Sequence, residues 1–247
     1  MSVAATIDHP AQAAAADAMP VIDAHRLYRF YHAGDEEVLA LRGVSLQVFR
    51  AEMVAVVGPS GSGKSTLLAC LAGLDDPDGG RVSVVGRRMS RVGERHRAKL
   101  RAEVLGVLLQ SGNLVGHLSV ADNVMLARRL AGRRDRAPVV TLLARLGLQD
   151  RAAALPSALS GGEVARAGLA VALANDPPVL LADEPTGELD RQTEEVVADL
   201  LSEQASEGRA VVVVTHSTVL AERADRILTL TDGIVSNPGS PTPGRPS

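Results

Sequence analysis

The chain is poor in aromatic residues. They make up 2% of its 247 residues, and tryptophan is absent. Proteins that bind single-stranded nucleic acids depend on aromatic side chains that stack on the bases, so this composition argues against that class. The net charge of −3 gives no basic field that would attract duplex DNA or an anionic membrane. We expect no nucleic-acid partner, and a core built from aliphatic side chains.

Cysteine and long apolar runs are also scarce. Cys70 is the only cysteine, so no disulfide can form within the chain. No uncharged apolar run approaches the roughly 18 residues that a membrane-spanning helix needs. Residues 1–20 lack the positively charged start of a secretory signal. We therefore expect a cytoplasmic protein; if it works at a membrane, another polypeptide supplies the membrane part. The arginine pairs Arg128-Arg129 and Arg133-Arg134 are expected on the solvated surface.

A phosphate-binding loop is the most informative motif. The run Gly58-Pro59-Ser60-Gly61-Ser62-Gly63-Lys64-Ser65-Thr66 matches G-x-x-x-x-G-K-[ST], whose backbone N–H groups surround phosphates. It lies between an apolar run that predicts a strand and one that predicts a helix, as the motif requires. We expect all of these residues except Pro59 to contact a nucleotide, Lys64 to act on its outer phosphates, and the Ser65 hydroxyl to bind Mg²⁺.

Strand and helix patterns alternate over most of the chain, which predicts an α/β fold with a largely parallel sheet covered on both faces. We place one domain at residues 21–235, with an antiparallel β region near its start and an inserted helical subdomain at about residues 88–170. The Ala-rich residues 1–20 and the Ser/Pro/Gly-rich residues 236–247 are predicted to be disordered.

Two acidic residues follow one of the predicted strands, Val179–Ala182. In a parallel sheet, ligands bind at the carboxyl ends of the strands, which is where the phosphate-binding loop also lies. Asp183 is therefore predicted to hold Mg²⁺. Glu184 is predicted to accept a proton from an attacking water, a role that typically contributes about 10²–10⁴-fold to a rate.

A third motif, Leu159-Ser160-Gly161-Gly162-Glu163, precedes an apolar-rich run typical of a helix. Ser160 is a suitable N-cap, and two glycines at a helix start leave N–H groups open to an anion. This would be a second phosphate site, and a chain with one phosphate-binding loop has no need of a second site for the same phosphates. The order and spacing of the three motifs resemble those of the ATP-binding-cassette (ABC) ATPases, where Leu-Ser-Gly-Gly is the signature sequence. The resemblance covers about residues 21–235.

This resemblance implies a P-loop NTPase core of the RecA type and MgATP hydrolysis by a homodimer, in which two cassettes enclose two ATP molecules head to tail. Catalytic roles then fall on Lys64, Gln110, Glu184 and His216. Further nucleotide contacts are implied for residues at matching family positions: Tyr31 on adenine, Gln110 on Mg²⁺ and the attacking water, His216 on the γ-phosphate, Asp190 at the dimer interface, and Ser160, Gly161, Gly162 and Glu163 on the partner cassette's γ-phosphate.

Local segments such as Ala182–Gly187 resemble the ATPases of macrolide-exporter-type, lipoprotein-releasing-type and bacterial cell-division systems. In these systems a separate integral-membrane permease chooses the substrate, so the resemblance implies a peripheral position on the inner face of the cell membrane. Four positions depart from the family pattern, and none of these departures removes a catalytic group. Leu109 stands where the family usually has an aromatic residue, and Gly116 stands where it favours proline. Val164 stands where a polar residue is usual, and Glu188 stands where a small residue is usual.

Two other functions stay open from the sequence. The first is a soluble ABC ATPase outside transport, for example of the cluster-assembly type. The second is a nucleotide-binding regulator that hydrolyses little ATP. The presence of Lys64, Asp183, Glu184 and His216 argues against the regulator, and a phosphate-release assay distinguishes it from an ATPase.

Overall fold

The computed structural model describes residues 19–33, 36–110 and 113–236, and the side chains of 32–37 are not described. The segments 1–20 and 236–247, predicted to be disordered, lie outside the described residues apart from Met19, Pro20 and Ser236. Their disorder remains a prediction.

The larger sheet has six strands in the order β10-β9-β3-β8-β7-β6. Neighbouring strands pair in parallel, except that β10 pairs antiparallel with β9. The strands span Met53–Val57 (β3), Leu105–Leu108 (β6), Val179–Asp183 (β7), Ala210–Val214 (β8), Arg226–Thr231 (β9) and Ile234–Ser236 (β10). Apolar strands of this kind are typical of a parallel sheet buried on both faces.

The smaller sheet is antiparallel, in the order β2-β1-β4-β5. Its strands span Ile22–Ala33 (β1), Glu36–Val48 (β2), Gly79–Val84 (β4) and Arg87–Arg88 (β5). The pairing of β1 with β2 is interrupted: Arg29 faces Leu41 but the next residue, Phe30, faces Leu39. Ala40 is thus an extra residue on β2, and this bulge lies against the phosphate-binding loop described below.

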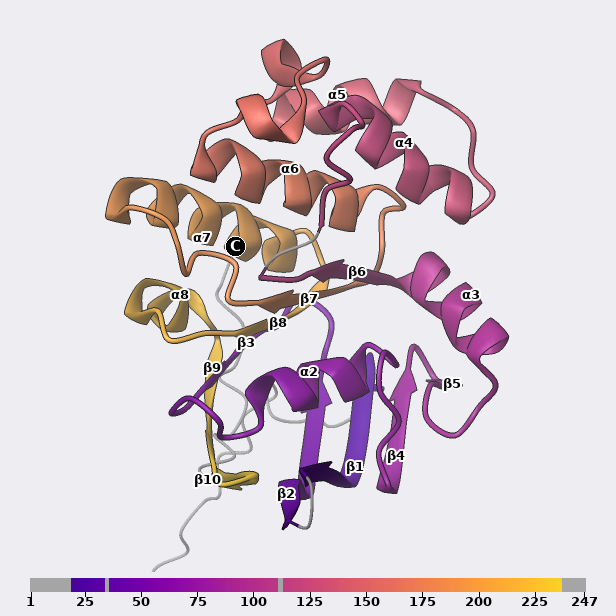
Figure 1. The fold of residues 1–247 in the computed structure, drawn as a ribbon, viewed down its shortest axis with the longest axis vertical. Helices are drawn as coiled ribbons and strands as arrows, with labels where there is room; N and C mark the ends of the chain where they lie inside the picture. The colour runs from indigo at the N-terminus through magenta and orange to yellow at the C-terminus, as the bar shows by residue number, and fades with distance from the viewer. Residues whose placement is uncertain (1–18, 34–35, 111–112, 237–247) are drawn as a thin grey trace, which may run out of the picture.

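Helices cover both faces of the six-stranded sheet, with α2 and the smaller sheet on one side and α6 and α7 on the other (Figure 1). The α-helices of the described residues span Lys64–Leu71 (α2), Glu94–Val104 (α3), Val120–Leu130 (α4), Ala137–Arg145 (α5), Gly161–Leu173 (α6), Arg191–Ser206 (α7) and Thr218–Arg223 (α8). Short 3₁₀ helices occupy Gln149–Arg151 and Pro156–Ala158. None of these helices is long and apolar enough to cross a membrane.

Two hydrophobic clusters stabilise this arrangement. Val54 and Val212 belong to the cluster that includes α2 and the smaller sheet. Val211 and Val213 belong to the cluster that includes α4, α5, α6 and α7. Successive residues of a strand point to opposite faces, so the central strands contribute to both clusters and hold the two layers in register.

Strand β6 is a difference from the sequence prediction. Residues 105–108 lie inside the segment assigned to the helical subdomain, yet they pair in parallel with β7. A run of four residues that directly follows a helix cannot be recognised by periodicity, and only its pairing with a buried neighbour makes it a strand. The α/β fold is confirmed, while the subdomain boundaries remain a prediction.

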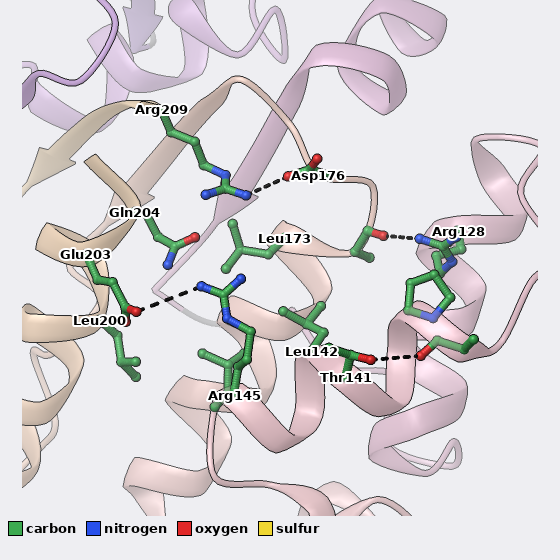
Figure 2. A pocket seen from close by; sticks show the side chains of 14 residues that line it. Arg128, Thr141, Leu142, Arg145, Leu173, Asp176, Leu200, Glu203, Gln204 and Arg209 are labelled. Atoms are coloured by element: carbon green, nitrogen blue, oxygen red, sulfur yellow. Dashed lines mark hydrogen bonds and ion pairs between the residues drawn. The ribbon is translucent and has the colours of Figure 1, made fainter. Parts of the chain in front are cut away.

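Arg128 is a second difference, because it is buried rather than solvated. Its side chain lies between α4 and the end of α6, donates to the Ala174 carbonyl oxygen over 2.6 Å, and pairs with Asp135 over 2.7 Å. Figure 2 shows it at one side of a pocket of about 430 Å³, which is lined by residues of α5, α6 and α7. The prediction of a solvated Arg128 is therefore wrong, since hydrogen bonds replace its contacts with water.

The two sheets are joined by a buried ion pair. Glu52 accepts hydrogen bonds of 2.8 Å from the Arg226 guanidinium and the Phe49 N–H, while Arg226 also donates to the Gln47 carbonyl oxygen over 2.6 Å. Both charged side chains are 10% exposed. The pair thus connects the end of β2 with the starts of β3 and β9.

We expect Glu52→Ala to destabilise the protein by about 3–5 kcal/mol, since it leaves the Arg226 cation buried without its counter-charge. Urea unfolding followed by circular dichroism measures this. Glu103→Ala is the control, because Glu103 pairs with Arg87 on the surface and its loss should change stability little. Equal stability losses in the two variants would contradict the assignment.

Candidate functional site

The phosphate-binding loop joins β3 to α2, and two of its glycines are required by close packing. Gly58 and Gly63 have φ of +152° and +101°, a region that other residues avoid. A Cβ atom on Gly58 would overlap the carbonyl oxygen of Leu230, and one on Gly63 would overlap that of Ala40. The β2 bulge and β9 therefore form the walls against which the loop is folded.

Lys64 is buried at the first turn of α2, with 6% of its surface exposed. Its ammonium donates to the carbonyl oxygens of Gly58 and Pro59 over 2.9 and 3.0 Å, and it lies 3.2 Å from His216 Nε2. The Ser62 hydroxyl is buried nearby without a hydrogen-bond partner among the described residues. The loop thus holds a buried cation, while the Ser62 hydroxyl lies on the side of Gly58 that faces the Leu230 carbonyl oxygen.

Ser65 and Asp183 are brought together from α2 and the end of β7. The Ser65 hydroxyl donates to Asp183 Oδ1 over 3.3 Å. Burial raises the pKa of Asp183, and the neighbouring charge of Glu184 acts in the same direction. Both residues predicted to bind a metal at this point therefore present oxygen atoms to the same small volume.

Glu184 lies directly after β7, in the left-handed backbone region with φ of +44°. Its N–H donates to the Val214 carbonyl oxygen of β8 over 2.9 Å, which holds this unusual conformation in place. Its carboxylate accepts from the backbone N–H of His216 over 3.1 Å and lies 3.5 Å from the ring atom Nε2 of His216. The predicted base is thus in contact with the histidine that is predicted to bind the γ-phosphate.

Tyr31 and Gln110 lie at the sides of this group. The Tyr31 hydroxyl donates to Asp75 over 2.8 Å. Burial raises the pKa of Tyr31, and a contact with the Thr66 hydroxyl of the phosphate-binding loop partly opposes this effect. Gln110 follows β6, is exposed, and lines a pocket of about 490 Å³ that Glu184 also lines.

The signature segment forms a capping box at the start of α6. The Ser160 hydroxyl accepts from the Glu163 N–H over 3.3 Å, and the Glu163 carboxylate accepts from the Ser160 N–H over 2.8 Å. This N–H and the guanidinium of Arg151, which donates over 2.8 Å, lower the pKa of Glu163. Sequence reasoning missed Arg151, because nothing in its local sequence indicates that its 3₁₀ helix packs beside α6.

Within one chain, the signature glycines pack against the segment that leads into α7. Gly161 and Gly162 pack beside Leu189 and Thr193, at the start of α7. Among the described residues, no hydrogen bond or ion pair joins the segment Ser160–Glu163 to the loop Gly58–Thr66. Within the single chain, hydrogen bonds and ion pairs connect Lys64 with His216, His216 with Glu184, and Ser65 with Asp183. Of the signature glycines, only Gly161 lines the pocket that Gln110 and Glu184 also line.

Asp190 has a structural role within the single chain. It is the N-cap of α7, and its carboxylate accepts from the Thr193 N–H over 3.0 Å and from the Thr193 hydroxyl over 2.8 Å. These hydrogen bonds, the backbone one first, lower the pKa of Asp190. Its predicted place at a dimer interface is a further role that the single chain does not test.

Comparison with known proteins identifies the family. The family model described as "ABC transporter" matches residues 41–187. The "Uncharacterized ABC transporter ATP-binding protein YbbA" of Escherichia coli (strain K12) is 46% identical over 217 residues, which cover 86% of this chain and 95% of YbbA. The "Macrolide export ATP-binding/permease protein MacB" of Hyphomonas neptunium is 42% identical over 227 residues, but these cover 35% of MacB.

Solved structures lead to the same family. A dimeric structure of the ABC transporter cassette MJ0796 is 36% identical, with a TM-score of 0.82, and the match covers 87% of this chain and 97% of that one. A dimeric post-hydrolysis structure of MJ0796 bound to ADP and Pi is 34% identical, with a TM-score of 0.83 and coverage of 91% and 100%.

The chain therefore belongs to the ABC transporter family. It is an ATP-binding cassette of that family, an ATPase subunit of a transporter, similar to YbbA and to the ATPase part of MacB. The family, the fold and the ATPase activity predicted from the sequence are confirmed.

We expect Asp190→Ala to lower the melting temperature by a few degrees, because it removes the N-cap of α7. Asp190→Asn keeps an oxygen that caps the helix and should melt close to the original protein. Thermal unfolding by circular dichroism compares the two. Identical melting of the Ala and Asn variants at a lowered temperature would show that the charge, rather than the cap, is what matters.

Proposed function

We propose that this chain binds MgATP at the carboxyl edge of the six-stranded sheet and hydrolyses it with the residues gathered there. The observation that carries this proposal is the convergence of Lys64, the Ser65–Asp183 pair and the Glu184–His216 pair on that edge. These groups come from three different strand ends, and a chance arrangement would not place a cation, two metal-binding oxygens and a base together.

The residues at this edge fit a magnesium ion. Mg²⁺ prefers oxygen ligands, and it commonly takes one or two from the protein and the rest from phosphates and water. Ser65 Oγ and Asp183 Oδ1, 3.3 Å apart, supply such a pair, and we propose Gln110 as a third contact. When bound, the ion would neutralise charge on the phosphate oxygens.

The loop residues fit the phosphates. Lys64 Nζ is held by two carbonyl oxygens and His216, and it can exchange these for phosphate oxygens at little cost in solvation. The backbone N–H groups at the start of α2 provide further donors, and we propose that Ser62 contributes from the same loop. We propose that Gly58, Ser60, Gly61, Gly63 and Thr66 complete this cradle.

In the proposed hydrolytic step, one residue accepts a proton and two others act on the charged phosphate. Glu184 accepts the proton of the attacking water, and its backbone conformation, fixed through Val214, sets the direction of the carboxylate. His216 orients the γ-phosphate beside it. Lys64 balances the charge that develops on the phosphate oxygens. Tyr31 is proposed to stack on the adenine.

We further propose a head-to-tail homodimer bound to an integral-membrane permease, on the cytoplasmic face of the cell membrane. No hydrogen bond or ion pair of the described residues joins Ser160–Glu163 to the phosphate-binding loop of their own chain, and we propose that a second copy brings the signature to the γ-phosphate. The structures of MJ0796 are dimeric, which supports a dimer of this chain. MacB combines ATP-binding and permease functions in its name, which supports a permease partner for this chain; we propose an exporter or force-transmitting system.

Glu184→Gln is expected to slow ATP hydrolysis by about 10²–10⁴-fold, because the amide cannot accept the proton, while ATP binding is retained. Phosphate release measures the rate, and calorimetric titration with ATP measures binding. Glu222→Gln, on the exposed side of α8, is the control. Turnover of Glu184→Gln near that of the control would mean that Glu184 is not the base.

The Glu184→Gln variant is also expected to form a dimer with MgATP and to co-purify with a membrane protein. Tagged Glu184→Gln, extracted gently from native membranes, should bring down a stoichiometric permease, identified by mass spectrometry. Ser160→Arg in the same background should prevent dimerisation in gel filtration, because the bulky cation blocks the signature. A soluble partner would favour an ABC ATPase outside transport, and a monomer with MgATP would contradict the dimer.

A further inference from the structure

Arg29 contacts the proposed adenine-stacking residue. Its guanidinium carbon lies 4.7 Å from the centroid of the Tyr31 ring, within the range of a cation–π interaction. Tyr31 keeps 38% of its surface exposed. One side of the ring is thus covered by a planar cation, while enough of the ring remains open for a second flat group to stack on it.

Arg29 is fixed by two carboxylates. Its Nε donates to Asp75 over 2.8 Å, and its Nη1 donates to Asp78 over 3.0 Å. Burial opposes the charged form, but the hydrogen bonds to these carboxylates outweigh it and raise the pKa of Arg29. The same Asp75 oxygen that accepts from Arg29 also accepts from the Tyr31 hydroxyl, over 2.8 Å. Ring, guanidinium and carboxylate therefore hold one another in a single geometry.

This cluster connects two parts of the site. Arg29 and Tyr31 belong to β1, whereas Asp75 and Asp78 belong to the loop after α2, the helix that begins at the phosphate-binding loop. Asp78 also accepts from the Phe30 N–H over 2.8 Å, a group beside the irregular pairing of β1 and β2. The contacts thus set the distance between the Tyr31 ring and the phosphate-binding loop.

We infer that Arg29 is a positioning residue for the adenine base, holding the Tyr31 ring between its own guanidinium and the incoming base. This inference rests on the proposed function, in which Tyr31 stacks on adenine. It goes further, because it holds that one part of the nucleotide affinity, the part that depends on the base, comes from the cluster of Arg29, Tyr31, Asp75 and Asp78. An ordinary surface ion pair would affect stability slightly and would not distinguish ligands with a base from those without one.

The test compares MgADP with magnesium pyrophosphate, which lacks the base and ribose, by isothermal titration calorimetry of the full chain. Arg29→Gln is expected to weaken MgADP binding by about 3- to 10-fold, the range that a cation–π contact supports, and to leave pyrophosphate binding unchanged. Tyr31→Ala should do the same or more. The double variant should bind MgADP no more weakly than Tyr31→Ala, because Arg29 acts through Tyr31.

Arg87→Gln is the matched control, since Arg87 forms a surface pair with Glu103 and should leave both affinities unchanged. If Arg29→Gln is unstable by circular dichroism, Arg29→Lys keeps the charge without the planar fork and should lose part of the MgADP affinity. Equal weakening of both ligands, additive losses in the double variant, or unchanged MgADP binding with Arg29→Gln would each overturn the inference. Failure of the unmutated chain to bind either ligand would instead contradict the proposed function.

Discussion

The parallel pairing of four neighbouring strands is the constraint on which the site depends. Strands β3, β8, β7 and β6 are adjacent and run in the same direction, so their carboxyl ends meet at one edge. The chain leaves β3 into the phosphate-binding loop, β8 toward His216, β7 into Asp183 and Glu184, and β6 toward Gln110. Residues spread over more than half of the sequence become neighbours through backbone pairing alone.

The sequence predicted those parts of the site that lie within short motifs, because each motif carries its own strand, turn and helix. The phosphate-binding loop and the acidic pair after β7 are of this kind. The walls of the site were not predictable in this way. The Ala40 bulge that closes on Gly63, and the Arg151 that fixes Glu163, act across strands or helices. Their positions follow from pairing and packing, which leave no local pattern.

The signature segment, Ser160–Glu163, is well formed at the start of α6, yet it makes no hydrogen bond with the phosphate-binding loop among the described residues. Its capping box is fully formed and Thr193 packs against Gly162, so hydrogen bonds and packing within the single chain hold the start of α6. A helix N-terminus with two glycines favours an anion, yet its own phosphate-binding loop makes no hydrogen bond with it among the described residues. If the signature binds the phosphate of a second cassette, as proposed, this preformed helix start would lose little conformational entropy on association.

His216 connects phosphate binding with the proposed base. Its Nε2 atom lies 3.2 Å from Lys64 Nζ and 3.5 Å from Glu184 Oε1. Nε2 without a hydrogen can accept a hydrogen bond from the Lys64 ammonium, and Nε2 with a hydrogen can donate one to the Glu184 carboxylate. The same nitrogen cannot do both, so the two hydrogen bonds exclude each other. In the proposed function, a phosphate that draws Lys64 away would remove the first contact and leave Nε2 free to form a hydrogen bond with Glu184 or with a phosphate oxygen. Phosphate binding at Lys64 would therefore change the hydrogen-bond partner of His216 beside the proposed base Glu184.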